Sequence, residues 1–398
     1  MNDNVTSKQA RRDSGIELLK IFAILLIITR HVVQTLGSTP SFFPAHDFVI
    51  KIEEASANPQ MLIVSMLQYS GAFGNALFFI CSAWFLIDRK RNEKPKALQM
   101  IADNWTVSIL ILVVFLVARG RLNGSLVLHS LFPFYFSNNW YINCYVVFLL
   151  IYPLLNTLIE NLDQKTFLRA AVLMIVWVFA LPFTGKVFGH LFGRGPSSFC
   201  AELGNWCAIY IIIAYWKRYR KSSMNNNRLN LLLVLIGFAG TFGVIALANF
   251  VGLRFSAFKE SLTIWNSRNA HPFILIMAFG LFNLARGIKL KNAAINYISG
   301  LSLYIYIVHE NILVRSLTRP AMWQFVYERF GYRHILAFVF GQVAIVFLCS
   351  LAFSMFYFHS LHRLVIRTCH NLYPKIAEIY CRLENRYLFG KNTCKTYD

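Results

Sequence analysis

The sequence predicts an all-α protein that crosses a membrane about ten times. Apolar segments of about 20 residues recur along the 398-residue chain, and an α-helix needs that length to cross the hydrocarbon core of a bilayer. Hydrophobic residues make up 57% of the chain and charged residues only 14%, against about 25% charged residues in soluble domains. The segments do not alternate apolar and polar residues, so they favour helices over the strands of a membrane barrel.

The ten predicted spans follow one another with short connections. They cover about 16–34, 64–87, 104–118, 140–159, 168–183, 200–216, 229–250, 271–286, 296–314 and 335–358. If the N-terminus is cytoplasmic, roughly two thirds of the 39 Lys and Arg residues fall in inner loops or at inner helix ends. This excess predicts that both termini are cytoplasmic. The arginines Arg11 and Arg12 precede the first span, as in an uncleaved signal anchor.

The chain divides into a membrane domain and a tail. We expect the domain over residues 1–358. The tail, over 359–398, mixes Leu, Ile and Tyr with Arg and Lys, which predicts either an amphipathic helix on the inner membrane surface or a solvated segment. The net charge of +21 is explained by inner loops that meet anionic lipids, and no nucleic-acid-reading motif is present. The eight cysteines form no CxxC pair and no Cys/His spacing of a metal site, so no metal is expected.

The first span, "ELLKIFAILLIITRHVVQT", carries an unusual number of ionisable residues for a membrane helix. Lys20 and His31 are eleven residues apart, which places them within about 20° of each other on one face and about 16 Å apart along the axis. Glu17 lies three residues before Lys20 and can pair with it. Lys20 either extends to the interface or binds a substrate anion, whereas Arg30 is interpreted as an interfacial anchor. His31 is either a structural group or a general base, because an imidazole can accept a proton at neutral pH.

Four stretches, in order along the chain, resemble the membrane acyltransferase 3 family. "IELLKIFAILLIITRH" is similar to its first helix, where a basic residue, usually Arg, precedes His; this chain has Lys20 at that position. "ALFFICSAWFLIDRK" resembles the second helix, with Ser82 in place. "NNWYINCYVVFLLIYPLLN" is similar to a later helix of the family that contains Trp. "ISGLSLYIYIVHENILVR" is similar to a late helix with Ser, Tyr and His.

The resemblance implies transfer of an acyl group, by family analogy acetyl, from cytoplasmic acyl-CoA to a hydroxyl of a cell-envelope polysaccharide or a lipid-linked sugar. His31 would be the general base. No cofactor would be bound, because acyl-CoA is a co-substrate. The enzyme would be a multi-pass protein of a bacterial inner membrane, in contact with lipids and with other polysaccharide-assembly proteins. The candidate residues for binding acyl-CoA or the acceptor are Lys20, Ser82, Tyr141, Glu202, His309, Glu310 and Arg315.

The chemistry of acyl transfer to oxygen matches the residues available. It needs a base for the acceptor hydroxyl, a donor to the developing oxyanion and a cationic region for the phosphates of CoA. Lys20 and the "RKRNEKPK" loop supply inner-face cations, and Tyr141, Ser82 or Asn75 could donate to the oxyanion. Glu202 begins the sixth span and is a candidate to orient His31, since a carboxylate there is costly unless it is hydrated or paired.

The ninth span carries a second polar face. Ser302, Tyr306 and His309 follow the i, i+4, i+7 pattern that places residues on one side of a helix, and Glu310 comes directly after them. His309 either bonds a neighbouring helix or orients substrate. Arg315 either binds an acidic sugar or anchors the helix at the interface.

Two other classes of function remain as alternatives. A transporter or flippase of envelope intermediates could use intramembrane His and Glu to relay protons, but no inverted repeat or broken half-helix pair is evident. A polysaccharide polymerase or glycosyltransferase would favour large outer loops or a carboxylate metal site. The longest outer loop is about 30 residues and has no such carboxylate spacing. The sequence therefore favours an O-acyltransferase.

Overall fold

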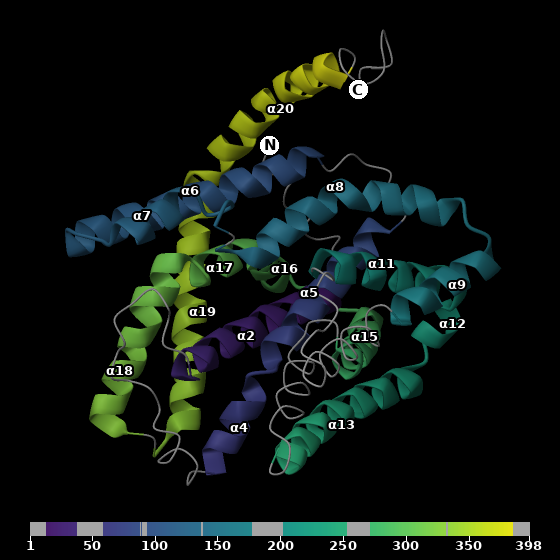
Figure 1. Ribbon diagram of the computed structural model, residues 1–398, viewed down its shortest axis with the longest axis horizontal. Coiled ribbons are helices and arrows are strands. Elements are labelled where there is room, and N and C mark those ends of the chain that lie inside the picture. Colours follow the sequence, from purple (N-terminus) through teal and green to yellow (C-terminus); the bar gives the residue numbers. More distant parts are fainter. Residues whose placement is uncertain are drawn as a thin grey trace, which may run out of the picture.

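The computed structural model describes residues 13–37, 59–87, 89, 94–136, 138–176, 202–252, 271–331 and 333–384, and every element in these ranges is helical (Figure 1). The helices, in chain order, are α2 (Ser14–Gly37), α4 (Pro59–Leu67), α5 (Ser70–Leu86), α6 (Lys94–Arg119), α7 (Gly124–Leu131), α8 (Trp140–Glu160), α9 (Gln164–Ile175), α11 (Glu202–Tyr219), α12 (Lys221–Met224), α13 (Asn227–Gly252), α15 (Pro272–Gly287), α16 (Ala293–Gly300), α17 (Ser302–His309), the π-helix η2 (Val314–Thr318), α18 (Arg319–Phe330), α19 (Ile335–Ser360) and α20 (His362–Glu384).

Helix α2 is the centre of the bundle. It packs against α5, α15, α16, α17 and α19, so residues from distant parts of the sequence meet on its surface (Figure 1). The contact with α5 is close because Gly74 faces α2: a Cβ atom there would lie 2.6 Å from the carbonyl oxygen of Ala23. Small residues at such contacts are typical of helices that pack within a membrane. The first span thus forms the core of the bundle, with its polar side chains inside it.

Apolar helices in the described residues fit a membrane protein. Three are long and apolar enough to cross a bilayer: Pro95–Arg119, Trp140–Glu160 and Ile335–Ser360, with mean hydropathies of 2.2, 1.9 and 2.5. Shorter apolar helices cover Ser70–Leu86, Asn227–Gly243 and Pro272–Gly287. Large apolar side chains are exposed on the first three, for example Val117, Leu154 and Phe356, as expected of surfaces that face lipid. The full count of ten spans and the cytoplasmic placement of both termini stay predictions.

Each predicted span overlaps a helix, but three boundaries were wrong. The range 64–87 is divided between α4 and α5. At the break, the hydroxyl of Ser70 donates to the carbonyl of Leu67 at 2.6 Å, and Nη1 of Arg30 donates to the carbonyl of Gln68 at 2.5 Å. Arg30 therefore binds the chain at the end of α4. Its interpretation as an interfacial anchor did not predict this contact.

The other two boundary errors concern the third and ninth spans. The third, predicted as short at 104–118, belongs to the 26-residue helix α6. The ninth, 296–314, is interrupted at Leu301 between α16 and α17; Gly300 precedes the break and has a low helix propensity. The helices α7 and α18 lie outside the predicted spans. The second half of the fifth predicted span, from residue 177 on, lies outside the described residues.

The tail forms a long helix from its first residues. Helix α20 continues from α19 after Leu361, packs against α6 where it begins, and then extends away from the bundle (Figure 1, yellow). It exposes Leu372, Ile376 and Ile379, which share one face because they are four and three residues apart. A helix with an exposed apolar stripe and many basic residues suits a membrane surface. Contact of the tail with the membrane stays a prediction.

Candidate active site

The polar face of α2 contacts α16 at one of its ends and α17 at the other. Lys20, Ile24, Ile27 and His31 are spaced by four, three and four residues, so they form one stripe along the helix. At one end, Glu17 meets α16, and at the other, His31 meets the end of α17. Because α2 is one continuous helix from Ser14 to Gly37, Lys20 and His31 lie on the same face, as predicted.

His31 lies against two side chains from the end of α17. Its Nδ1 atom is 2.9 Å from Oε1 of Glu310 and 3.1 Å from Nε2 of His309. The two imidazole rings are 5.3 Å apart between centroids. The side chain of Glu310 is only 4% exposed and that of His31 is 14% exposed, so the carboxylate is buried while the imidazole of His31 is still accessible.

The hydrogen bonds of this cluster define which nitrogen of His31 carries a proton. Nδ1 of His309 lies 2.9 Å from the carbonyl oxygen of Ile305, which can only accept, so Nδ1 of His309 is the donor. In the neutral ring, Nε2 of His309 is then an acceptor. Because both Glu310 and His309 present acceptors to Nδ1 of His31, that atom carries the proton. The Nε2 atom of His31 keeps a lone pair, which is the state that a general base requires.

Two arginines neutralise the buried Glu310 carboxylate. Nη2 of Arg319 donates to Oε1 of Glu310 at 2.5 Å and also to the carbonyl oxygen of His309. Nη1 of Arg315 lies 3.8 Å from Oε2 of Glu310. The Arg319 side chain is 3% exposed and that of Arg315 is 41% exposed. A buried carboxylate without such partners would be costly, so Arg319 is what allows Glu310 to stay charged beside His31.

The chain turns sharply after His309 to bring these arginines back. Helix α17 ends at His309, and the side-chain oxygen of Asn311 accepts a hydrogen bond from the backbone of Leu313 at 3.0 Å. The amide of Asn311 also donates to the hydroxyl of Ser108 on α6 at 3.1 Å. The π-helix η2 follows, and π-helical turns are frequent at functional sites. This turn returns Arg319 to the carbonyl of His309, ten residues earlier in the chain.

The other end of the α2 stripe holds a second group of charges. Nζ of Lys20 lies 3.1 Å from Oε2 of Glu17, which confirms the predicted pair, and the hydroxyl of Ser299 donates to the same carboxylate. Nearby, Nζ of Lys217 lies 4.7 Å from the centroid of the Trp84 ring, and the guanidinium of Arg286 lies 5.1 Å from it. Cations from α2, α11 and α15 thus gather where α5 ends.

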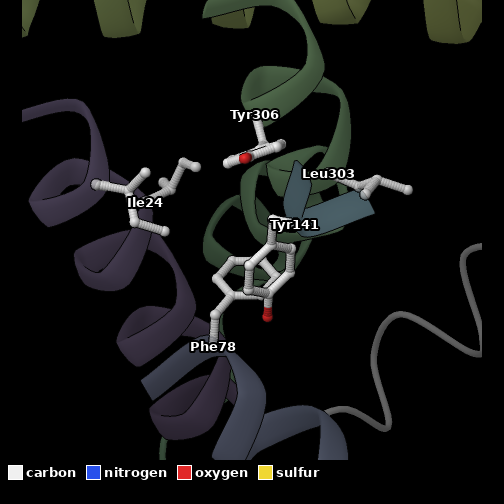
Figure 2. Close-up of a pocket in the computed structure, with 6 residues that line it drawn as sticks. Ile24, Phe78, Tyr141, Leu303 and Tyr306 are labelled. Carbon is white, nitrogen blue, oxygen red and sulfur yellow. The ribbon is translucent and has the colours of Figure 1, made fainter. Parts of the chain in front are cut away.

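Between these two ends lies a small cavity. It has room for about one water molecule at most (Figure 2). Its walls come from α2, α5, α8 and α17; the lining residues are Ile24, Ile27, Phe78, Tyr141, Leu303 and Tyr306 (Figure 2). The ring of Tyr306 contacts that of His309, with centroids 5.4 Å apart, so the cavity adjoins the histidine cluster. The hydroxyl of Tyr141 is buried and has no hydrogen-bond partner among the described residues.

The remaining predicted site residues are less central. The hydroxyl of Ser82 donates to the carbonyl of Phe78 in its own helix at 3.0 Å. Glu202 is the first residue of α11, and the position of its side chain lies outside what the structure describes. The carboxylate that contacts His31 belongs to Glu310. Sequence reasoning proposed Glu202 for that role because it could not supply distances between helices.

Arg319 was missed entirely, because nothing in "SLTRP" marks it. A second polar cluster was also missed. Asp103 on α6 is fully buried; its Oδ1 accepts from the hydroxyl of Tyr357 at 2.6 Å and lies 3.1 Å from Nδ1 of His362. Its Oδ2 accepts from the hydroxyl of Tyr304 at 3.3 Å. The sequence signal was present, because Asp103 is an isolated carboxylate in an apolar helix and such residues need partners.

Three of the site residues could also ligate a metal ion by their types and positions. His31, His309 and Glu310 each offer one ligand atom, and these atoms lie within 4.8 Å of one another. However, Oε1 of Glu310 already accepts from Arg319, and a guanidinium this close would repel a cation. The arrangement favours proton transfer through His31.

Comparisons with known proteins support the same chemistry. The family model described as an acyltransferase domain matches residues 13–359, which run from α2 to the last turn of α19. Searches among curated proteins and among solved structures each gave no match. The matched range begins one residue before α2 and therefore includes His31, Glu310 and Arg319. Because that model covers most of the chain, the protein belongs to acyltransferase family 3 and is an O-acyltransferase.

Proposed function

We propose that the protein transfers an acyl group, acetyl by analogy with the family, from acyl-CoA to a hydroxyl of a cell-envelope polysaccharide or lipid-linked sugar, in a bacterial inner membrane. The observation that carries the proposal is the proton arrangement at His31: Glu310 and His309 both face Nδ1, which leaves Nε2 able to accept. A family assignment gives acyl transfer, and this geometry supports a specific base for it.

In the proposed reaction, Nε2 of His31 removes the proton from the acceptor hydroxyl. The oxygen attacks the thioester carbonyl carbon, and the carbon–sulfur bond breaks when the intermediate collapses. The imidazolium of His31 returns its proton to the departing thiolate, so the products are an ester and free CoA. Glu310 stabilises the imidazolium formed on the way, in the manner of the carboxylate in a Ser–His–Asp triad. The buried hydroxyl of Tyr141 is a candidate donor to the oxyanion, since it has no other hydrogen-bond partner among the described residues and its ring lines the adjoining cavity.

The donor would approach from the opposite end of the stripe. Lys20, Lys217 and Arg286 surround the end of α5 at Trp84 and Phe85, where they would attract the phosphates of CoA. The pair with Glu17 reduces the net charge at Lys20, so the other two cations would contribute more of the attraction. His31 lies about 16 Å further along α2, and an extended pantetheine arm would bridge that distance.

The test compares wild type with His31→Ala at equal membrane abundance. Cell-envelope polysaccharide from both strains is analysed by proton NMR for ester acyl signals, and exported polymer is measured separately. Loss of the ester signal with normal export is the expected result. Unchanged ester signals would contradict His31 as the base, and loss of export with intact esters would favour the transporter.

A further inference from the structure

A buried tryptophan on α18 binds the backbone of α2 beside His31. Nε1 of Trp323 donates to the carbonyl oxygen of Val32 at 3.0 Å, and Val32 is the residue that follows His31 in α2. Trp323 is among the largest fully buried side chains of the described residues. An indole N–H can only donate, and it usually has a partner when it is buried. The bond therefore joins α18 to α2 next to the proposed base.

Helix α18 also holds the carboxylate that contacts His31. Arg319 is the first residue of α18 and Trp323 comes four residues later, so both side chains lie on one face, about 6 Å apart along the axis. Arg319 donates to Oε1 of Glu310, whereas Trp323 donates to α2. About one turn of α18 thus connects the two partners of the His31–Glu310 contact, which lie far apart in the sequence.

The position of His31 in α2 explains why such a connection matters. His31 lies within the last two turns of that helix, which ends at Gly37, and the ends of helices open most easily. The other side of the contact has its own support, because the amide of Asn311 donates to a hydroxyl of α6 and so holds the turn that carries Glu310. The 2.9 Å contact between His31 and Glu310 therefore depends on how firmly the end of α2 is held.

We propose that Trp323 is a positioning residue for acyl transfer; the inference rests on the proposed function of His31. Its bond to Val32 keeps the His31 ring at the distance from the Glu310 carboxylate at which the ring can accept and return a proton. The loss of this bond should slow the chemical step, because a displacement of about 1 Å can cost on the order of 10²-fold in rate. Binding of acyl-CoA should be unaffected, since its phosphates would lie at the other end of the α2 stripe.

The test compares Trp323→Phe with Trp105→Phe in the full chain, reconstituted in lipid vesicles. Trp105 is the matched control, because its Nε1 also donates to a backbone carbonyl at 3.0 Å, that of Leu131 on α7. Radiolabelled acetyl-CoA is the donor, and the cell-envelope fraction of the His31→Ala strain, which should lack the ester, is the acceptor. We expect Trp323→Phe to lower kcat by about 10- to 100-fold, with the KM for acetyl-CoA within about twofold of wild type. Trp105→Phe should leave both constants within about twofold.

A double variant separates positioning from a general effect on the fold. If Trp323 acts through the His31–Glu310 contact, adding Trp323→Phe to Glu310→Gln should lower kcat by less than about twofold more, because the charge beside His31 is already gone. An independent structural effect would multiply the two losses. In case Trp323→Phe does not fold, benzothienylalanine in place of Trp323 keeps the shape of the ring and replaces its N–H with sulfur. It should give the same loss.

The outcomes separate this inference from the proposed function. An unchanged kcat in Trp323→Phe, a change confined to the KM, or an equal loss in Trp105→Phe would overturn the positioning role while leaving His31 as the base. A multiplied loss in the double variant with Glu310→Gln would overturn it as well. If wild type transferred no label, the proposed function and the role of Trp323 would both be wrong. A loss of kcat that is absent from the control and from the Glu310→Gln background supports positioning.

Discussion

Two buried clusters in this molecule each join a carboxylate to a histidine. They differ in the partners of the carboxylate and in the exposure of the histidine. In the first, Glu310 contacts Nδ1 of His31, which leaves Nε2 with its lone pair, and the His31 side chain is 14% exposed. In the second, both carboxylate oxygens of Asp103 accept hydrogen bonds from tyrosine hydroxyls, and the side chain of His362 is only 7% exposed. The same residue types thus form a partly exposed site suited to proton transfer in one place and a more deeply buried structural contact in the other.

The surroundings of the two clusters account for this difference. The carboxylate of Glu310 is held by Arg319, a charged partner that leaves the histidine available for chemistry. The carboxylate of Asp103 is held by tyrosine hydroxyls from α17 and α19 and by the first residue of α20. It therefore ties the tail helix to the bundle. A buried polar network that is fully satisfied adds rigidity, whereas unsatisfied groups mark candidate functional sites.

The largest effect on activity is expected from Glu310→Gln. Arg319 and Nδ1 of His31 contact the same oxygen, Oε1, so the amide oxygen of glutamine would take that position, and the substitution removes the negative charge that stabilises the imidazolium of His31. Acyl transfer should fall by on the order of 10²- to 10⁴-fold, the range that general base catalysis contributes. Initial rates per mole of folded protein give the measurement. A rate within a few-fold of wild type would show that the carboxylate does not control His31.

Arg319→Lys should have the next largest effect. Lysine keeps the charge, but its shorter and more flexible side chain does not hold a donor at the position of Nη2, the atom that bonds both Glu310 and the carbonyl of His309. A small shift of Glu310 should lower the rate by about 10- to 100-fold, because a displacement of about 1 Å can cost on the order of 10²-fold. Arg315→Lys is the matched control, since that side chain is half exposed and its contact with Glu310 is 3.8 Å. Equal losses in both variants would contradict a special role for Arg319.

Asp103→Asn should change stability and leave catalysis almost unaffected. The amide cannot accept all of the hydrogen bonds that the carboxylate accepts, and an unsatisfied buried group costs about 1–3 kcal/mol. Thermal unfolding of the detergent-solubilised protein should therefore begin at a lower temperature, while the rate per folded molecule stays within about twofold of wild type. A loss of rate as large as that of Glu310→Gln, without a loss of stability, would remove the distinction between the clusters.

The smallest effect is expected from Lys20→Arg, which restores the residue usual in the family. Arginine can pair with Glu17 and can also bind phosphate through two parallel hydrogen bonds. Activity should be kept or raised, with the change confined to the KM for acyl-CoA. Complete inactivation would mean that the site requires an amine at this position.

The sequence predicted the helices better than the site. Each long apolar run overlaps a helix of the described residues, because such runs favour burial in a bilayer, and helical periodicity placed Lys20 and His31 on one face. The partner of His31 could not be found in this way: Glu310 is 279 positions away, and only the packing of α2 on α17 brings the two together. Arg319 depends on the turn after His309, and Asp103 on contacts among α6, α17, α19 and α20. Spacing along one helix says nothing about such contacts between helices.

The central claim is that His31, and no other carboxylate-paired histidine of the described residues, accepts the proton of the acyl acceptor. The most direct measurement compares His31→Gln with His362→Gln, each at equal membrane abundance, for the rate of ester formation per mole of folded protein. The account predicts a loss of at least about a hundredfold for His31→Gln and a change of no more than a few-fold for His362→Gln. Ester formation at the wild-type rate in His31→Gln, or an equal loss in both variants, would contradict it.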